Sequence, residues 1–231
     1  MKKIVLLALA ALFALPVLAQ EEEWDNVVYS SPGDVVKFEL LSNVGYGYHF
    51  IKSPDFSSRM SDEYFINIVR LGIYPIDALG IELGLDVAYS DFASNTHAFF
   101  LSEDRKIQAA DFSQIVPGTG TLDRHFGSFD IVSVNAPLIL KLRAGSFWIG
   151  GGAIGSLNLP GRAEYAYRQG NRRVTVSERG AKVNLFTYGL VATLGFDSLG
   201  FYFKYYPKTS RLLPDGSVDM SYMTLGVVFD Y

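Results

Sequence analysis

Histidine, serine and carboxylate side chains gather around one long polar stretch of the chain, residues 92–127. His97 and His125 lie toward its two ends, and His49 lies further upstream. The same stretch also contains Ser94, Ser102, Ser113, Asp104, Asp111 and Asp123. A His–Ser–acid set could perform acyl transfer, and a histidine–carboxylate set could bind a metal ion. Polar connections contain these residue types by default, and no spacing fixes them at hydrogen-bonding distance. We therefore predict neither a catalytic nor a metal site.

Arginines are concentrated in a second polar stretch, residues 163–181 and the residue before it. They are Arg162, Arg168, Arg172, Arg173 and Arg179. Guanidinium groups can pair with two phosphate oxygens at once, so one interpretation is contact with lipopolysaccharide phosphates. The other interpretation is a solvated hairpin tip. The net charge of −4 argues against a nucleic-acid partner.

One glycine-rich motif formally matches a dinucleotide-binding pattern. Gly150-Gly-Gly-Ala-Ile-Gly155 fits GxGxxG, but that fingerprint requires a helix to begin at the glycines. Here the alternation of a strand continues through Ser156–Pro160, so we predict no cofactor. The chain has no cysteine, which excludes disulfides, cysteine-ligated metals and thiol nucleophiles.

The first 19 residues have the pattern of a secretory signal peptide. Lys2 and Lys3 precede an apolar run from Ile4 to Leu15, and small residues allow cleavage after Ala19. The run is too short to span a membrane, which takes about 20 residues. We predict an exported protein with a periplasmic segment at 20–34 and one domain at 35–231.

The remainder of the chain alternates with a period of two, which is typical of β-strands. Eight such segments are predicted: 36–48, 69–73, 81–90, 132–143, 147–159, 186–196, 199–206 and 222–231. Short connections fall at 75–79, 143–147 and 196–199, and long polar ones at about 52–63, 92–127, 163–181 and 207–219. An even strand number with short turns at one end and long loops at the other predicts an all-β, eight-stranded antiparallel up-and-down transmembrane β-barrel.

The two faces of these segments indicate which side meets lipid. Bulky apolar residues such as Phe201, Leu225 and Phe229 share one face, whereas the other is rich in small polar residues with few charges. Aromatic residues gather near the segment ends, with Tyr74 assigned to the lower group. A bulky face with two aromatic girdles favours a lipid-facing exterior over the wet exterior of a soluble, lipocalin-like carrier.

Charged residues on the small-residue face would lie inside the barrel. They are Lys37, Glu39, Arg70, Glu82, Asp86, Lys141, Arg143, Lys204 and Asp230. An unpaired charge there would cost several kcal/mol, so we expect opposite signs to meet across neighbouring strands. The expected pairs are Asp230 with Lys37, Arg70 with Glu39 and Glu82, and Asp86 with Lys141. An ion-selective constriction is one interpretation; a salt-bridged plug is favoured because eight strands leave no through-channel.

One hairpin and the C-terminus carry a family resemblance. Asn135-Ala-Pro-Leu-Ile-Leu-Lys-Leu-Arg143, followed by the glycine-rich segment Ala144–Gly152, resembles the central hairpin of the PorT-like outer-membrane β-barrel family. The ending Leu225-Gly-Val-Val-Phe-Asp-Tyr231 looks like an assembly signal, with Leu225, Val227, Phe229 and Tyr231 as its alternating apolar positions. The resemblance spans about residues 35–231. It implies a small outer-membrane barrel and the barrel-assembly machinery as a partner.

The sequence therefore predicts a small non-porin protein of the bacterial outer membrane. Its role would be structural or recognition through extracellular loops, with outer-membrane lipid and lipopolysaccharide as partners and no catalysis. Two alternatives stay open: an outer-leaflet lipid-modifying enzyme of the lipid A deacylase or palmitoyltransferase kind, and a soluble ligand carrier. The enzyme would need clustered His, Ser and acid side chains, and the carrier an apolar cavity.

Overall fold

The computed structural model describes residues 35–53, 55–115, 123–169 and 172–230. The predicted signal peptide (1–19), the segment 20–34 and Tyr231 lie outside the described residues. The alternating sequence forms extended chain almost throughout, as its β-branched and aromatic residues favour. The elements are β1 (Val36–Leu40), β2 (Asn43–Lys52), β3 (Ser57–Ile76), β4 (Leu79–Ser94), β5 (His97–Leu101), β6 (Ile107–Asp111), α2 (Phe112–Ile115), β7 (Asp123–Ala144), β8 (Phe147–Asn158), β9 (Gly161–Gln169), β10 (Arg172–Ala181), β11 (Phe186–Phe196), β12 (Leu199–Tyr205) and β13 (Ser221–Asp230).

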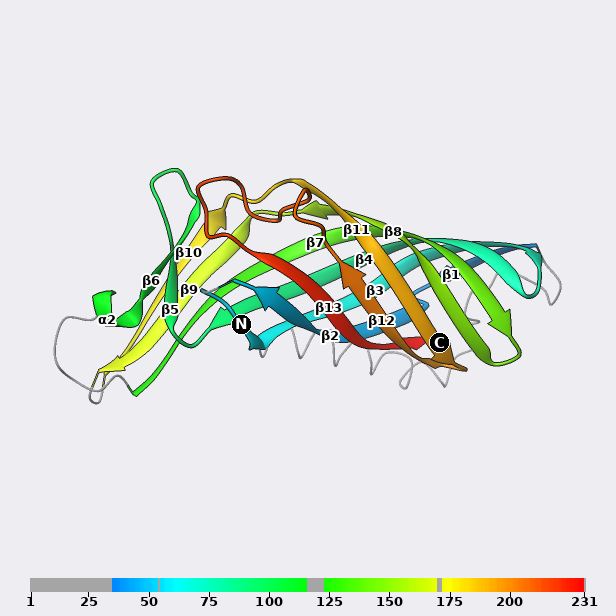
Figure 1. The fold of residues 1–231 in the computed structure, drawn as a ribbon, viewed down its shortest axis with the longest axis horizontal. Helices are drawn as coiled ribbons and strands as arrows, with labels where there is room; N and C mark the ends of the chain where they lie inside the picture. Colours follow the sequence, from blue (N-terminus) through cyan, green and yellow to red (C-terminus); the bar gives the residue numbers. More distant parts are fainter. Residues whose placement is uncertain (1–34, 54, 116–122, 170–171, 231) are drawn as a thin grey trace, which may run out of the picture.

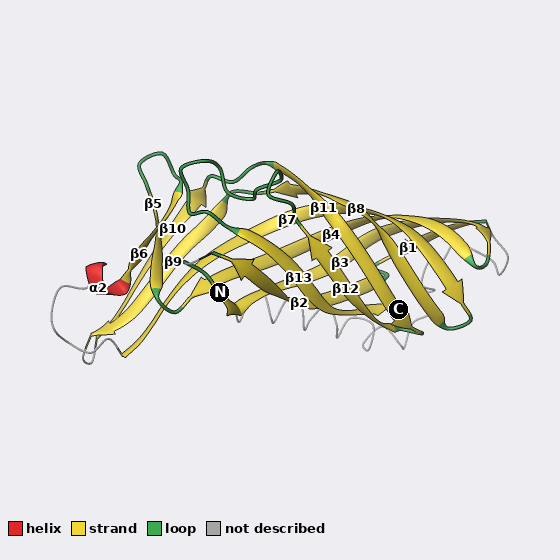
Figure 2. Cartoon of the chain, in the orientation of Figure 1, coloured by secondary structure: helices red, strands yellow, loops and turns green. Residues whose placement is uncertain are grey.

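Eight strands close into a ring by antiparallel pairing. The circuit runs β2, β3, β4, β7, β8, β11, β12 and β13, and β13 pairs again with β2. Figure 1 and Figure 2 show these strands strongly tilted and wound around a common axis. The order around the ring follows the order in the chain, so the predicted all-β antiparallel class is confirmed. Closure removes the edge strands that an open sheet would expose.

Tight turns join ring strands at one end, which we call the short-turn end. They lie at Ile76–Leu79, Ala144–Phe147 and Phe196–Leu199, where the alternation predicts them. Gly145 and Asp197 supply the positive φ angles of two of these turns, 62° and 52°. The prediction of these three connections is confirmed.

The opposite end, the long-connection end, contains more structure than the sequence predicts. Residues 163–181 are not a loop: they form most of the hairpin of β9 and β10, which prolongs the sheet beyond β7. The stretch 92–127 holds the hairpin of β5 and β6 and the short α2. Residues 57–63 belong to β3. These strands lack a continuous apolar alternation, so their polar composition reads as loops in the sequence.

The first predicted strand is divided. Leu41 has a positive φ of 51° and separates β1 from β2. β2 continues around the ring against β13, whereas β1 pairs only with the lower part of β3 in the described chain. Asn67, which interrupts the alternation of the sequence, stands where the register of β3 against β4 shifts. Such a bulge re-aims the following side chains.

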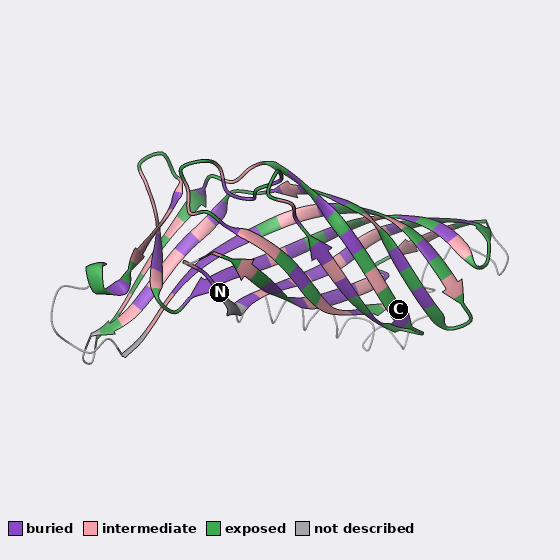
Figure 3. Cartoon of the chain, in the orientation of Figure 1, coloured by how far each residue is buried: buried purple, intermediate pink, exposed green. Residues whose placement is uncertain are grey.

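The outward face of the ring is apolar and the inward face is polar. Figure 3 shows the alternation of exposed and buried residues along the strands. Phe201, Leu225 and Phe229 are each about half exposed (50%, 47% and 47%), so they do not fill the ring. The predicted orientation of the two faces is confirmed. Tyr74 is an exception to the predicted girdle, because it is 6% exposed. Its neighbour Ile73 faces outward, so Tyr74 faces inward as the alternation of a strand requires.

A buried apolar cluster, which we call the cap cluster, occupies the long-connection end. Its members come from β4, β7, β9 and β10 on one side, and from Phe56 before β3, the β5–β6 hairpin and the connection 206–220 on the other. They are Phe56, Phe92, Phe99, Ile107, Phe129, Ile131, Ala163, Ala181, Leu212, Leu213 and Met220. Stacked rings such as Phe56 on Phe99 (centroids 4.4 Å apart) fill the space. The sequence does not predict this cluster.

No helix within the described residues is both long enough and apolar enough to cross a membrane.

Candidate functional site

Arg70 stands at the centre of an ionic cluster inside the short-turn end of the ring. Its guanidinium contacts both carboxylate oxygens of Asp230, at 3.0 and 3.2 Å, and Glu39 at 3.3 Å. The bidentate geometry with Asp230 joins β3 to β13 and fixes the orientation of both side chains. The expected pair of Arg70 and Glu39 is present. No ion pair joins Arg70 to Glu82 in the part of the chain that the structure describes.

Glu82 is the centre of a second group in the same space. It accepts from Lys141 Nζ at 3.1 Å and lies 3.4 Å from Arg143 Nη2, and the Tyr74 hydroxyl also donates to it. Arg143 donates to the Tyr74 oxygen at 3.0 Å. Lys141 lies 3.9 Å from Asp230, which connects this group to that of Arg70. The inward Tyr74 thus completes an ionic network rather than an outer girdle.

Two more of the expected pairs, besides that of Arg70 and Glu82, are wrong. Lys37 does not meet Asp230: β1 leaves β2 at Leu41, and Lys37 instead lies over the Tyr74 ring, 5.2 Å from its centroid. Asp86 does not meet Lys141, because Lys141 is opposite Gly80 in the register of β4 and β7. Asp86 accepts from Asn67 Nδ2 at 2.6 Å, so its partner is the side chain at the bulge.

The most buried ion pair joins Lys204 to a residue that the sequence does not single out. Lys204 Nζ lies 2.6 Å from Glu63 Oε1, and both side chains are 3% exposed. The Tyr202 hydroxyl donates to the same oxygen at 3.1 Å. Glu63 was missed because 52–63 reads as a loop. The signal that could find it is the inward parity it shares with Phe65.

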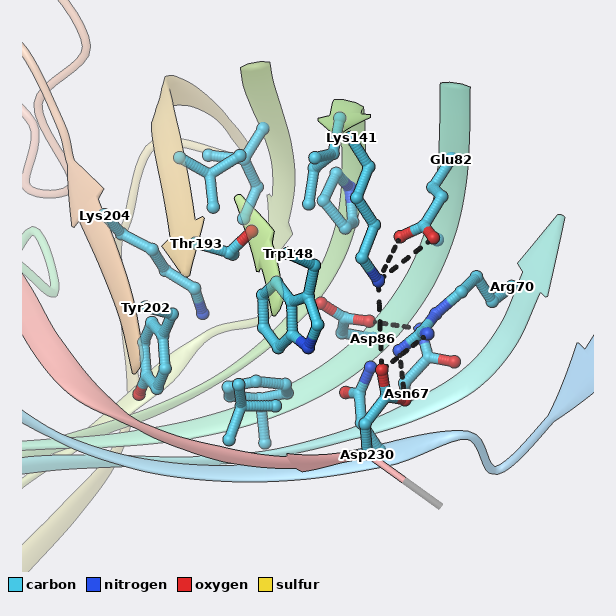
Figure 4. A pocket seen from close by; sticks show the side chains of 18 residues that line it. Asn67, Arg70, Glu82, Asp86, Lys141, Trp148, Thr193, Tyr202, Lys204 and Asp230 are labelled. Atoms are coloured by element: carbon cyan, nitrogen blue, oxygen red, sulfur yellow. Dashed lines mark hydrogen bonds and ion pairs between the residues drawn. The ribbon is translucent and has the colours of Figure 1, made fainter. Parts of the chain in front are cut away.

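These groups surround a small internal cavity of about 70 Å³, which Figure 4 shows with its labelled side chains. This volume admits only a few water molecules. Among the described residues, ten Lys, Arg, Asp and Glu side chains make up the ionic groups in the interior and at its short-turn mouth, five of each sign: Lys37, Arg70, Lys141, Arg143 and Lys204, with Glu39, Glu63, Glu82, Asp86 and Asp230. Such a balanced interior offers no excess charge to bind a free ion.

The arginines of 162–179 lie on strands and not on a hairpin tip. Register pairs Arg162 with Arg179 and Arg168 with Arg173, so four of the five share one face of the β9–β10 hairpin. Arg162 is engaged by Asp130 on β7 and lies 3.8 Å from Glu164. Burial lowers the pKa of Arg162, but the Asp130 carboxylate raises it by more, so this pKa lies above its ordinary value. As a phosphate ligand Arg162 is therefore the poorest of the set, whereas Arg168, Arg172, Arg173 and Arg179 are exposed.

The histidines and serines do not form a catalytic set. His97 Nδ1 lies 2.9 Å from Thr96 Oγ1, and its Nε2 is 3.6 Å from Asp55, too long for a hydrogen bond. The hydroxyl of Ser94 accepts from the backbone N–H groups of Thr96 and His97, so it serves the turn. His49 is fully buried against Phe92 and bonded to Thr224.

Asp111, an acidic member of the same stretch, has a structural role. Asp111 accepts from the backbone N–H of Ser113 at 2.7 Å and thereby caps α2. The hydroxyl of Ser113, followed by its backbone N–H, holds the pKa of Asp111 below the usual range. Within the described residues, no three His, Asp or Glu side chains converge as metal ligands would. The GxGxxG residues lie within β8, and no helix begins there.

Comparisons with known proteins identify no family. No family model and no curated protein matches the sequence, so the resemblance to the PorT-like family is not confirmed and stays a prediction. Among solved structures, the chain is similar to Ail, the attachment invasion locus protein of Yersinia pestis, which was crystallised in complex with the heparin analogue sucrose octasulfate. The similarity covers 85% of this chain and 97% of that chain at 10% identity, with a TM-score of 0.34. A likeness this distant establishes neither the family nor the activity of the chain.

Proposed function

We propose that the closed ring is an eight-stranded transmembrane β-barrel of a bacterial outer membrane. The observation that carries the proposal is the exposed outer face: every ring strand contributes bulky apolar side chains to it. Examples are Phe50 on β2, Leu71 on β3, Leu83 on β4, Leu140 on β7, Ile149 on β8, Leu190 on β11, Phe201 on β12 and Leu225 on β13. A belt of this extent exceeds the apolar patches of water-soluble monomers, and closure satisfies the backbone groups that lipid cannot.

The interior supports a non-porin role. A neutral ionic network fills the short-turn half, and the cap cluster covers the long-connection end. We infer that the barrel is a membrane anchor for its extracellular end, with a structural or recognition role in the envelope and without catalysis. Sidedness follows from the turns, with the short-turn end in the periplasm and the β5–β6 and β9–β10 hairpins outside.

Electrophoresis tests the barrel directly. Outer-membrane barrels often stay folded in cold SDS, so detergent-extracted protein should migrate differently before and after boiling. The same preparation should insert into phosphatidylcholine vesicles without ionic conductance. Identical mobility of both samples, together with solubility after detergent removal, would favour the soluble-carrier alternative. Sustained conductance would contradict the plugged interior.

The recognition surface proposed for lipopolysaccharide is the arginine face of the β9–β10 hairpin. Arg168 and Arg173, paired across the strands, bring two guanidinium groups to one place. An anion bound between two facing guanidinium groups would offset their mutual repulsion. Replacing Arg173 with alanine should weaken lipopolysaccharide binding in micelles, whereas Lys182→Ala removes one exposed charge elsewhere and should not. Equal binding by both variants would remove the hairpin from the proposal.

One further feature, the assembly signal, is retained as a proposal. The outward positions Leu225, Val227 and Phe229 of β13 would present the assembly signal to the barrel-assembly machinery. The enzyme alternative has no support of this kind, because no catalytic set converges around the described histidines.

A further inference from the structure

A second basic site lies at the long-connection end, where β2 and β13 meet the connection 206–220. This groove encloses about 530 Å³. Its lining residues are Ile51, Lys52, Ser53, Lys208, Arg211, Asp219, Met220 and Ser221. Three cations face one carboxylate there, so the groove carries an excess of positive charge beside two hydroxyl groups.

The connection that supplies Lys208 and Arg211 is held from three directions. Asn184 Nδ2 donates to the carbonyl of Arg211 at 2.7 Å, and the backbone N–H of Val218 donates to Ile107 at 3.0 Å. The Ser210 hydroxyl accepts from the backbone N–H of Tyr188 at 2.5 Å. Leu212, Leu213 and Met220 anchor the same segment in the cap cluster. The groove is therefore preformed, which lowers the entropic cost of binding.

The cations of the groove remain available to a ligand. Arg211 lies 3.6 Å from Asp215, but that carboxylate is 98% exposed, and ion pairs of this kind are weak. Neither Lys52 nor Lys208 has an ion pair among the described residues. One guanidinium and two ammonium groups around a cavity match a tetrahedral phosphate, because the guanidinium fork binds two oxygens and each ammonium neutralises charge.

The register places this groove at the border of the apolar outer face. Lys52 pairs with Ser221 in the ladder of β2 and β13, and two residues further down the outward pair is Phe50 and Met223. Both of these apolar side chains are exposed. A phosphate held at Lys52 would leave an attached acyl chain beside Phe50, whereas a soluble phosphate would gain nothing from that position.

We propose that this groove binds the phosphate group of a membrane lipid in the outer leaflet, at the boundary of the apolar belt. That the phosphate belongs to a lipid rests on the proposed membrane location. That the groove binds a phosphate rests on the groove alone. It adds a site formed by Lys52, Lys208 and Arg211 to the arginine face of the hairpin.

Calorimetric titration of the full-length protein in micelles tests the proposal with three probes. Short-chain phosphatidic acid should bind, short-chain phosphatidylcholine should not, and inorganic phosphate should bind more weakly. Lys208→Ala/Arg211→Ala should weaken phosphatidic acid binding about tenfold or more. The control Arg105→Gln/Lys182→Gln removes the same charge from exposed positions outside both the groove and the arginine pair, and should leave phosphatidic acid binding unchanged. A heat-modifiable band must be retained by both variants.

The outcomes separate the groove from the barrel proposal. Equal binding of inorganic phosphate and phosphatidic acid would support the phosphate site and overturn its lipid source. Equal losses in both double variants would show general attraction to positive charge and overturn the groove. No binding of either phosphate probe by a protein with heat-modifiable mobility would overturn the site and leave the barrel intact. Phosphate binding by a protein without heat-modifiable mobility would support the phosphate site and overturn the barrel.

Discussion

Replacing Lys204 with methionine should destabilise the protein strongly, because it leaves the Glu63 carboxylate buried without its cation. At 2.6 Å and an effective dielectric constant of about 20, the attraction between the two charges is about 6 kcal/mol. Burying both ions costs several kcal/mol each, so the pair as a whole contributes little net stability. Removing Lys204 leaves the cost of burying the Glu63 carboxylate uncompensated, so the free energy of unfolding should fall by about 3–5 kcal/mol.

Urea unfolding of the protein in phosphatidylcholine vesicles, followed by tryptophan fluorescence, measures this change. Glu63→Gln keeps an acceptor for the Tyr202 hydroxyl and removes the charge, so Lys204→Met/Glu63→Gln should recover most of the loss. Lys182→Met, at an exposed lysine, is the control and should change stability by less than about 0.5 kcal/mol. A loss below about 1 kcal/mol for Lys204→Met, or a double variant less stable than the single one, would refute the reasoning.

Three further changes test other parts of the structure by the same unfolding measurement. Phe129→Ala removes a fully buried ring from the cap cluster and should lower the free energy of unfolding by about 3–5 kcal/mol. Phe100→Ala, at a partly exposed ring, should cost less, and equal losses for the two variants would contradict a packed cap. A β-carbon at Gly152 would clash with the backbone oxygen of Leu138, so Gly152→Ala should cost about 1–3 kcal/mol, whereas Gly155→Ala has open space and should be neutral. Tyr74→Phe deletes a hydroxyl bonded to Glu82 and Arg143 and should cost about 1–3 kcal/mol; no loss would place that ring outside the network.

Local alternation predicts the strands, the tight turns and the two faces, because each depends on neighbouring residues in one strand. Phe201 and Leu225 face outward as their parity requires. The pairing of charges inside the ring depends on the register between neighbouring strands. That register is not set by the residues of one strand alone. Asp86 therefore meets Asn67 and not Lys141, and the break at Leu41 carries Lys37 away from Asp230.

The cap cluster was beyond sequence reasoning for a different reason. Its apolar residues are spread over connections without a common period, such as Phe56, Phe99 and Leu212. Only the folding of the β5–β6 hairpin and of the connection 206–220 against the sheet brings them together. Polar composition likewise hid β9, β10 and the start of β3, since strands that project into solvent need no continuous apolar face.

The cap cluster covers the long-connection end of the ring, whereas the internal cavity lies toward the short-turn end. The cavity and the mouth at that end share four lining residues: Arg70, Lys141, Trp148 and Asp230. In the proposed membrane orientation, water and protons should reach Lys141 through the short-turn opening, and the cap cluster should slow their entry from the side of the outer hairpins. In oriented vesicles, a pulse of heavy water should therefore exchange the protons of Lys141 faster from the short-turn side than from the hairpin side.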